Sequence, residues 1–397
     1  MCRLAPSMLV GILGGILAMT YLNSRGDPVF GPVGTYIPGA EAGTMPVDDF
    51  EPYSVHREPF ACGGETCEGW LYFPREVGMD DPPVPVVVMG HGLGLQKDCN
   101  LERLIHRFVL HRMAVLIFDY RSFGGSGGVP RHVINPFRQL EDWEAAVAYA
   151  ASGALGQQVN ASAVAVFGYS FGGGHAAVVG SKWSPVADKV TAVISAVPYL
   201  DPLETLLHRL KISYESGGGL AGFAALARLA ALSVQDCVRA VLGLPPLYIP
   251  IAGYPGEVAA LAAPDSIDYL LLVPDKPLGG WQNQVAARVM MYTMAYRPMS
   301  YVAGIEKPWL VLSALHDTLC PAEVVRSAVA RAPEGMAELM EFDAAHFEFY
   351  PAVDADLSHR VGVEVAAWAC EKLSCLGPTP RAERVLFGPN AGEPVPA

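Results

Sequence analysis

The sequence predicts an α/β fold with a mostly parallel central sheet, helices on both of its faces and a helical cap. Short apolar segments rich in β-branched residues alternate with segments of helical periodicity. One long interruption, residues 201–307, separates two of these apolar segments. With 397 residues, 51% of them hydrophobic and 17% charged, the chain is long enough to bury a large core.

The first elements are two strands, a helix, a third strand and a second helix. Residues 69–74 (GWLYFP) have the pattern of a strand, and 84–92 (VPVVVMGHG) form the continuous β-branched run of a strand buried on both faces. Residues 101–113 have the apolar spacing of a helix. A further buried strand is expected at 114–120 (AVLIFDY), followed by an amphipathic helix at 135–152 with a proline near its first turn.

The later elements continue the alternation. A strand at 163–169 leads into a glycine-rich helix start, and a buried strand follows at 190–198. Beyond the interruption, strands are expected at 309–315 and 337–343, and a helix at 359–373 closes the series. Such an order favours parallel pairing of the strands.

These elements divide the chain into segments. The α/β core is expected at 59–200 and 308–375. A structureless loop as long as 201–307 is improbable, and its helical stretches predict a helical cap above the sheet edge. The Gly-, Pro- and Asp-rich residues 26–58 are expected to be a linker or extended arm, and 376–397 a flexible tail.

The N-terminus carries an uncharged apolar run from Met8 to Leu22, preceded by Arg3. Its 15 residues are fewer than the ~20 that span a bilayer, and they suit a signal-peptide core better, although no A-x-A cleavage site follows. Residues 1–25 are therefore expected to be a signal peptide or an uncleaved anchor, with a buried helix as the alternative. This predicts a secreted or membrane-anchored protein, with the cytoplasm as the alternative.

The spacing of the cysteines also bears on the cellular compartment of the protein. Cys62 and Cys67 bracket a turn between two expected strands, and Cys370 and Cys375 repeat the spacing at the end of the last helix. In an oxidising compartment either pair could form a disulfide, whereas in the cytosol all eight cysteines would be free thiols. Asn160 begins a glycosylation sequon in a segment expected at the surface.

Charge and motif content exclude several functions. The net charge of −13 provides no basic stripe for phosphates, so no nucleic-acid partner is expected. Zinc-type Cys/His spacing and a phosphate-binding P-loop are absent from the sequence, so no cofactor and no metal are expected. A small-molecule substrate is the expected partner, with membrane association through the N-terminal run.

The stretch AVFGYSFGGGHAA at 164–176 contains a serine between glycines at a strand-to-helix turn. Side chains would clash in such a sharp turn, so Gly168 and Gly172 allow Ser170 to project its hydroxyl above the sheet. The helix that follows supplies free backbone N–H groups for a developing oxyanion. This arrangement predicts a nucleophilic serine.

A serine nucleophile needs a base and an acid that orients the base. His346 lies on the loop after the final strand, and Asp317 lies just past the strand at 309–315. The order Ser170, Asp317, His346 is the one that this architecture requires. Asp201, after the preceding strand, is the alternative acid.

Two other histidines receive different interpretations. His316 precedes the last strand and is expected to lie at the surface or behind the site. His175 lies on the helix behind the serine and is expected to pack within it.

The oxyanion would be held by two backbone amides. Gly92, in MGHGLG, lets the chain turn so that the Leu93 N–H faces the site together with the Phe171 N–H. The alternative for this segment is an ordinary strand-to-helix turn. The glycine-rich loop DYRSFGGSGG at 119–128, with Arg121, is expected to flank the pocket and to be structural.

In combination, GHGLG, DYRSFGGSGG, GYSFGG, HD after a strand and a late AAH resemble the α/β-hydrolase superfamily. From about Tyr53 to Leu373 the chain is similar to its esterase, thioesterase and X-Pro-dipeptidyl-peptidase-like branch, which includes fungal polyketide acyltransferases. The resemblance implies a covalent mechanism carried by Ser170, His346 and Asp317.

The expected function is therefore a serine hydrolase of the carboxylesterase or thioesterase type, EC 3.1, acting through an acyl-enzyme. An acyltransferase with the same triad is the alternative, and a non-catalytic ligand-binding protein is the third class. Apolar residues of the segment 201–307 would either line an acyl pocket or pack as core.

Overall fold

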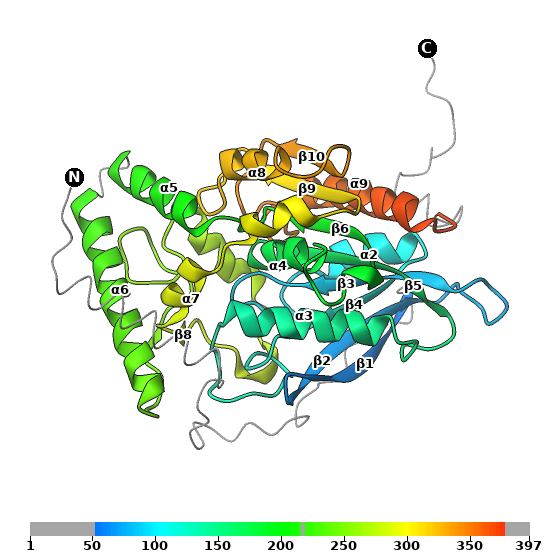
Figure 1. Ribbon diagram of the computed structural model, residues 1–397, viewed down its shortest axis with the longest axis horizontal. Coiled ribbons are helices and arrows are strands. Elements are labelled where there is room, and N and C mark those ends of the chain that lie inside the picture. The colour runs from blue at the N-terminus through cyan, green and yellow to red at the C-terminus, as the bar shows by residue number, and fades with distance from the viewer. Residues whose placement is uncertain (1–51, 216–218, 378–397) are drawn as a thin grey trace, which may run out of the picture.

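A computed structural model describes residues 52–215 and 219–377 (Figure 1). Within them, eight strands form one sheet in the order β1-β2-β4-β3-β5-β6-β9-β10. The strands are β1 (Tyr53–Cys62), β2 (Glu65–Pro74), β3 (Val84–Gly90), β4 (Ala114–Phe118), β5 (Val159–Tyr169), β6 (Val190–Ala196), β9 (Trp309–Ala314) and β10 (Ala337–Phe342). From β4 to β10 the neighbours are parallel, whereas β2 is antiparallel to both β1 and β4. The predicted α/β-hydrolase fold is confirmed.

The strand β1 corrects the expected linker boundary, because Tyr53 already belongs to the sheet although 26–58 was expected to lie outside it. The β1–β2 hairpin turns at Gly63 and Gly64, whose φ angles of 50° and 87° favour glycine. Behind the turn, Cys62 is bonded to Cys67 across the two strands, with Cα atoms 5.7 Å apart. The second expected pair, Cys370 and Cys375, is also bonded.

Helices cover both faces of the sheet (Figure 1). On one face α2 (Glu102–Leu110) packs against α9 (Ala355–Leu373). On the other lie α3 (Pro136–Ala150), α4 (Phe171–Val179) and α8 (Ala322–Val329). The strand residues alternate between the two cores, as Val87 and Val88 of β3 do, which explains the continuous apolar run of the sequence.

Side-chain caps fix where two of these helices begin. The Asn135 side chain accepts hydrogen bonds from the first turn of α3. The Asp354 side chain does the same for α9, which therefore begins at Ala355, four residues before the predicted start. The core helices thus begin where a polar side chain can satisfy their free N–H groups.

The segment between β6 and β9 forms the cap, and it lies at one end of the sheet (Figure 1). It is less helical than its sequence predicts, because short 3₁₀ helices and a small antiparallel sheet separate its three α-helices. Its elements are α5 (Pro202–Glu215), α6 (Gly219–Val241), β7 (Tyr248–Ile249), η2 (Pro264–Leu272), η3 (Leu278–Gly280), β8 (Val285–Ala286), α7 (Val289–Ala295) and η4 (Pro298–Gly304). A further 3₁₀ turn, η1 (Ala187–Lys189), precedes β6.

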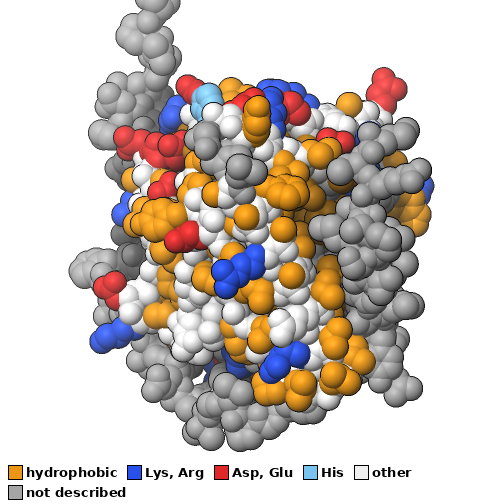
Figure 2. All heavy atoms as spheres, turned by 90° about the vertical axis from the view of Figure 1, so that its left-hand side faces the viewer, with side chains coloured by type: hydrophobic (Ala, Val, Ile, Leu, Met, Phe, Trp, Pro, Cys, Tyr) orange, Lys and Arg blue, Asp and Glu red, His pale blue; other side chains and the backbone are white. Residues whose placement is uncertain are grey.

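Figure 2 shows the face at the cap end, where hydrophobic side chains are spread between isolated charged ones. In the described part of the chain, one helix, Ala221–Val241, is long and apolar enough to cross a membrane by length and composition alone. Core helices of water-soluble proteins pass the same criterion. The expected signal peptide or anchor at 1–25 and nearly all of the expected tail lie outside the described residues.

Candidate active site

Ser170 lies in the sharp turn between β5 and α4, with φ 54° and ψ −114°. A Cβ at Gly168 would lie 1.9 Å from the Gly172 carbonyl oxygen, and one at Gly172 would lie 2.5 Å from the His91 carbonyl oxygen. Only glycine fits at either position. The Ser170 backbone is held by its N–H bond to the Ala196 oxygen, at 2.8 Å. The strained serine is thus imposed by tight packing around it.

The structure brings the three predicted side chains together. His346 Nε2 lies 2.9 Å from Ser170 Oγ, and His346 Nδ1 lies 2.6 Å from Asp317 Oδ2. The second carboxylate oxygen of Asp317 accepts hydrogen bonds from the backbone N–H groups of Leu319 and Cys320, at 2.8 and 2.6 Å. Both the imidazole and the carboxylate are buried. This geometry can transfer a proton from the serine to the histidine and stabilise the resulting imidazolium.

The alternative groups lie elsewhere and have partners of their own. Asp201 pairs with Arg297 at 2.6 Å and caps the start of α5. His316 is exposed and lies 2.6 Å from Asp343 Oδ1. His175, fully buried in α4, contacts the hydroxyl of Tyr296 at 2.7 Å and an oxygen of Gln139 at 3.2 Å.

Leu93 and Phe171 line the same cavity as Ser170. The loop after β3 that carries Leu93 is held from the cap, because Tyr269 Oη donates to the Leu93 oxygen at 3.0 Å and Trp281 Nε1 donates to the Gly94 oxygen at 2.8 Å. These two bonds hold the peptides that follow Leu93, and the Gly92 oxygen, which shares a peptide unit with the Leu93 N–H, lies 3.0 Å from His91 Nδ1. Such preorganisation is what an oxyanion-binding amide needs.

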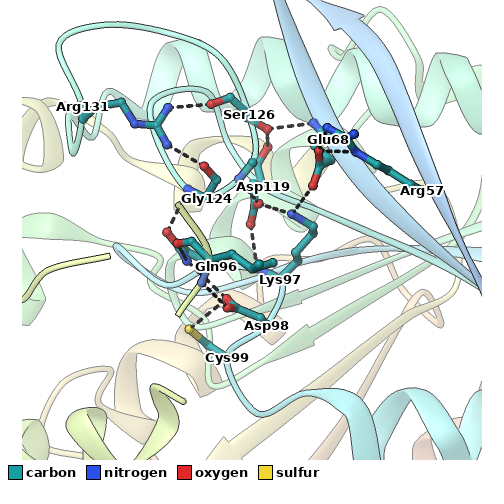
Figure 3. Close-up of polar contacts among 12 residues, drawn as sticks. Arg57, Glu68, Gln96, Lys97, Asp98, Cys99, Asp119, Gly124, Ser126 and Arg131 are labelled. Atoms are coloured by element: carbon teal, nitrogen blue, oxygen red, sulfur yellow. Dashed lines mark hydrogen bonds and ion pairs between the residues drawn. The ribbon is translucent and has the colours of Figure 1, made fainter. Parts of the chain in front are cut away.

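A buried charge network anchors the far end of this loop (Figure 3). Lys97 Nζ lies 2.5 Å from Asp119 Oδ2 and 3.0 Å from Glu68 Oε1, and its backbone N–H donates to Asp119 Oδ1 at 2.7 Å. Burial lowers the pKa of Lys97, but the two carboxylates outweigh it and the net pKa is raised. Gly125 N–H and Ser126 Oγ donate to Asp119, which binds the glycine-rich loop 119–128 to the same network. The structural role expected for that loop is therefore visible in its contacts.

Sequence reasoning missed Asp265, a buried residue at the start of η2 in the cap. Its Oδ2 accepts hydrogen bonds from the backbone N–H groups of Thr318 and His346, at 3.1 and 3.2 Å. One cap carboxylate therefore joins the loop that carries Asp317 to the loop that carries His346. No motif marks this residue in the sequence, because it lies far along the chain from both loops.

The cavity above Ser170 has about 790 Å³ between its walls, part of it open to solvent. The cap supplies most of the wall. Its apolar stretches were expected either to line a pocket or to pack as core, and they do both. Leu226 and Met290 line the cavity, whereas Leu272 packs in the core. The other apolar cap residues of the wall are Leu206, Leu229, Leu261, Val289 and Met294.

Among the described residues, Asp317, Cys320 and His346 bring ligand atoms within 4.8 Å of one another. The carboxylate and the imidazole are already hydrogen-bonded to each other and to the loop. Burial raises the pKa of the Cys320 thiol well above its usual value, which disfavours the thiolate that binds metals. The cluster is therefore better explained by the hydrogen-bonded triad than by a metal centre.

The strand order, the strained serine turn and the Ser–His–Asp geometry define an α/β hydrolase. Residues 81–348 match the family model described as serine aminopeptidase, S33, and the chain belongs to this family of α/β hydrolases.

Several curated relatives and solved structures are similar over most of the chain. The quorum-quenching protein AidA of Acinetobacter baumannii is 31% identical over 72% of this chain and 85% of its own length. A thiohydrolase of Eupenicillium brefeldianum is 22% identical over 74% and 87% of the two chains. Among solved structures, GrgF from Penicillium has a TM-score of 0.61 at 20% identity, covering 81% of this chain and 99% of its own.

Proposed function

We propose that the protein is a serine hydrolase that cleaves a carboxylic ester or thioester. The observation that carries this proposal is the continuous hydrogen-bonded series from Ser170 through His346 to Asp317 at the base of an apolar cavity. An apolar wall suits the acyl chain of such a substrate. One relative, from Eupenicillium brefeldianum, is named a thiohydrolase, which agrees with this reaction class.

The reaction would proceed by two acyl transfers. Ser170 Oγ attacks the carbonyl carbon while His346 Nε2 takes its proton, and the amides of Leu93 and Phe171 stabilise the oxyanion. His346 then returns the proton to the leaving alkoxide or thiolate as the carbon–heteroatom bond breaks, which leaves an acyl-enzyme. Water attacks this ester with the same base, and Ser170 regains its proton. Asp317 holds the imidazole in the required orientation throughout.

An acyltransferase is the second candidate, since other relatives are named polyketide transferases, among them grgF of Penicillium at 23% identity. The same residues would act, and an alcohol would replace water in the second step. Product analysis with an added alcohol separates the two activities. Ester product in excess of free acid, at an alcohol concentration far below that of water, would favour the transferase.

Labelling with a fluorophosphonate probe tests the nucleophile. Wild type should be labelled, whereas Ser170→Ala and His346→Ala should not, because the probe reacts only with an activated serine. An exposed serine variant, Ser152→Ala, serves as the matched control and should label as wild type does. Hydrolysis of acyl esters and thioesters by the unlabelled wild-type protein is the second step. Equal labelling of wild type and Ser170→Ala would refute the proposal.

We also propose that the protein follows the secretory route, which its two bonded cysteine pairs support. Sequencing the first residues of the protein purified from its native source, together with thiol counting, tests this. A mature protein that begins at Met1 and has eight free thiols would refute it.

A further inference from the structure

Arg209 is a basic side chain in an otherwise largely apolar wall. It lies on α5 and lines the cavity above Ser170. It also lines an adjoining cavity of about 640 Å³ that is bounded by α5, α6 and the segment 255–264. The guanidinium therefore faces the space that a substrate bound at Ser170 would extend into.

The guanidinium has a single weak protein partner in the described part of the chain. Arg209 Nη1 donates to the Ala260 carbonyl oxygen at 3.3 Å, and no described carboxylate forms an ion pair with it. Two other cap arginines differ: Arg297 binds Asp201 at 2.6 Å, and Arg288 lies 3.6 Å from Asp236. A guanidinium offers five N–H donors in a planar fork, so most of those of Arg209 stay available.

The surroundings do not neutralise this charge. Glu257 lines the adjoining cavity, but its Oε2 accepts from the Tyr254 N–H at 2.9 Å and the carboxylate makes no described ion pair with Arg209. Tyr199, which borders the guanidinium, has a pKa raised by burial and stays neutral. Arg209 is half-buried, and its burial lowers the pKa of the guanidinium. A half-buried cation of this kind is stabilised by an anionic oxygen from a ligand.

We propose that Arg209 binds a carboxylate of the substrate, so that the preferred ester or thioester combines an apolar body with an anionic group remote from the scissile carbonyl. This inference rests on the proposed serine hydrolase activity and specifies its substrate class. The carboxylate belongs either to the acyl chain or to the leaving group. Arg209 selects the substrate and takes no part in bond making or breaking.

Three esters distinguish these sources. Phenyl hexanoate is neutral, the phenyl monoester of adipic acid carries a carboxylate at the end of the acyl chain, and the hexanoyl ester of para-hydroxybenzoic acid carries it on the leaving group. Each is compared between wild type and variant, so that differences in intrinsic reactivity cancel. The variants are Arg209→Met, which keeps length without charge, and Arg209→Lys, which keeps charge without the fork. Arg228→Met, on the exposed side of α6, is the matched control.

For one of the two carboxylated esters, kcat/KM should fall about 10- to 100-fold in Arg209→Met, mainly through KM. The neutral ester should change less than twofold. Arg209→Lys should recover part of the loss, and Arg228→Met should behave as wild type. The ester that responds identifies the side of the substrate that Arg209 binds.

Similar changes for all three esters in Arg209→Met would overturn the carboxylate site. So would an equal response of Arg228→Met, because the effect would then be general electrostatics. In both cases labelling of Ser170 by fluorophosphonate and turnover of phenyl hexanoate would leave the hydrolase proposal intact. Absence of labelling and of turnover in wild type would overturn the hydrolase proposal and the inference together.

Discussion

Replacing Asp265 tests whether the cap holds the catalytic loops in place. Asp265→Ala removes the acceptor of two backbone N–H groups, those of Thr318 and His346. A buried donor left without an acceptor costs about 1–3 kcal/mol, so the two together should lower the free energy of unfolding by about 2–6 kcal/mol. Asp265→Asn can keep an oxygen in the same place, and its loss should be about 1 kcal/mol.

The same change should reduce catalysis. The two loops carry Asp317 and His346, and a displacement of about 1 Å in a catalytic group can lower the rate about 100-fold. We therefore expect kcat of Asp265→Ala to fall about 100-fold with KM changed less than threefold, and kcat of Asp265→Asn to fall less than tenfold.

Urea unfolding, followed by kcat and KM on one neutral ester, measures both effects. Asp268→Ala is the matched control, since it removes a carboxylate from the same 3₁₀ helix that makes no described hydrogen bond. If Asp265→Ala unfolded within about 0.5 kcal/mol of wild type and kept kcat within twofold, the reasoning would be wrong, because surface substitutions alone produce changes of that size. If the alanine variant fails to fold, the asparagine variant still separates charge from hydrogen bonding.

Three further predictions concern packing, pH and the hairpin. Gly172→Ala places a Cβ 2.5 Å from a backbone oxygen, so denaturant unfolding should show a loss of about 1–3 kcal/mol; an unchanged midpoint would contradict this. Burial lowers the pKa of His91 to about 4 and of His175 to about 3, against about 6.5 unfolded, so their stabilisation is complete above about pH 6.5 and is lost as pH falls. Burial likewise lowers the pKa of His106 and His132 to about 4, whereas it raises the pKa of Asp142 to about 6 and so offsets only one of the four histidines. The free energy of unfolding should therefore fall as pH is lowered from about 6 to 4, and a flat unfolding profile there would be inconsistent with this. Cys62→Ser opens a disulfide across a short loop and should cost about 2 kcal/mol in unfolding free energy relative to oxidised wild type, and this difference should disappear when both proteins are measured under reducing conditions.

The sheet could be predicted from the sequence because its strands are buried on both faces, as Val87 and Val88 are, which produces apolar runs that polar loops interrupt. A strand ending near Cys62 is expected from the hairpin turn, but its start at Tyr53 is not, because β1 is at the edge of the sheet. Its outward residues are polar, and Pro59 interrupts its pattern, which an edge strand tolerates. The cap was predicted as a segment, but its 3₁₀ helices carry no distinct periodicity.

The candidate triad could be proposed because a sharp turn, a strand end and a following loop each leave a local mark around Ser170, Asp317 and His346. Asp265 and Lys97 leave none. Their contacts join segments that are distant in the sequence. Only the folded chain shows that a cap carboxylate contacts the loops of Asp317 and His346 and that buried Lys97 anchors the loop that also carries Leu93. The same holds for Arg209, which forms no ion pair with a carboxylate among the described residues.

The cap contacts have a consequence for how substrate reaches the serine. Tyr269 holds the loop that carries Leu93, and Asp265, four residues earlier on the same 3₁₀ helix, holds the loops that carry His346 and Asp317. If this helix moved away, all three loops would lose these contacts together. An opening at this position would therefore be incompatible with the arrangement that brings Asp317 and His346 together. The two cavities that Arg209 lines extend along α5 and α6, so a substrate that enters on that side would leave these contacts intact. The substrate would then enter past Arg209, the residue that is proposed to select it.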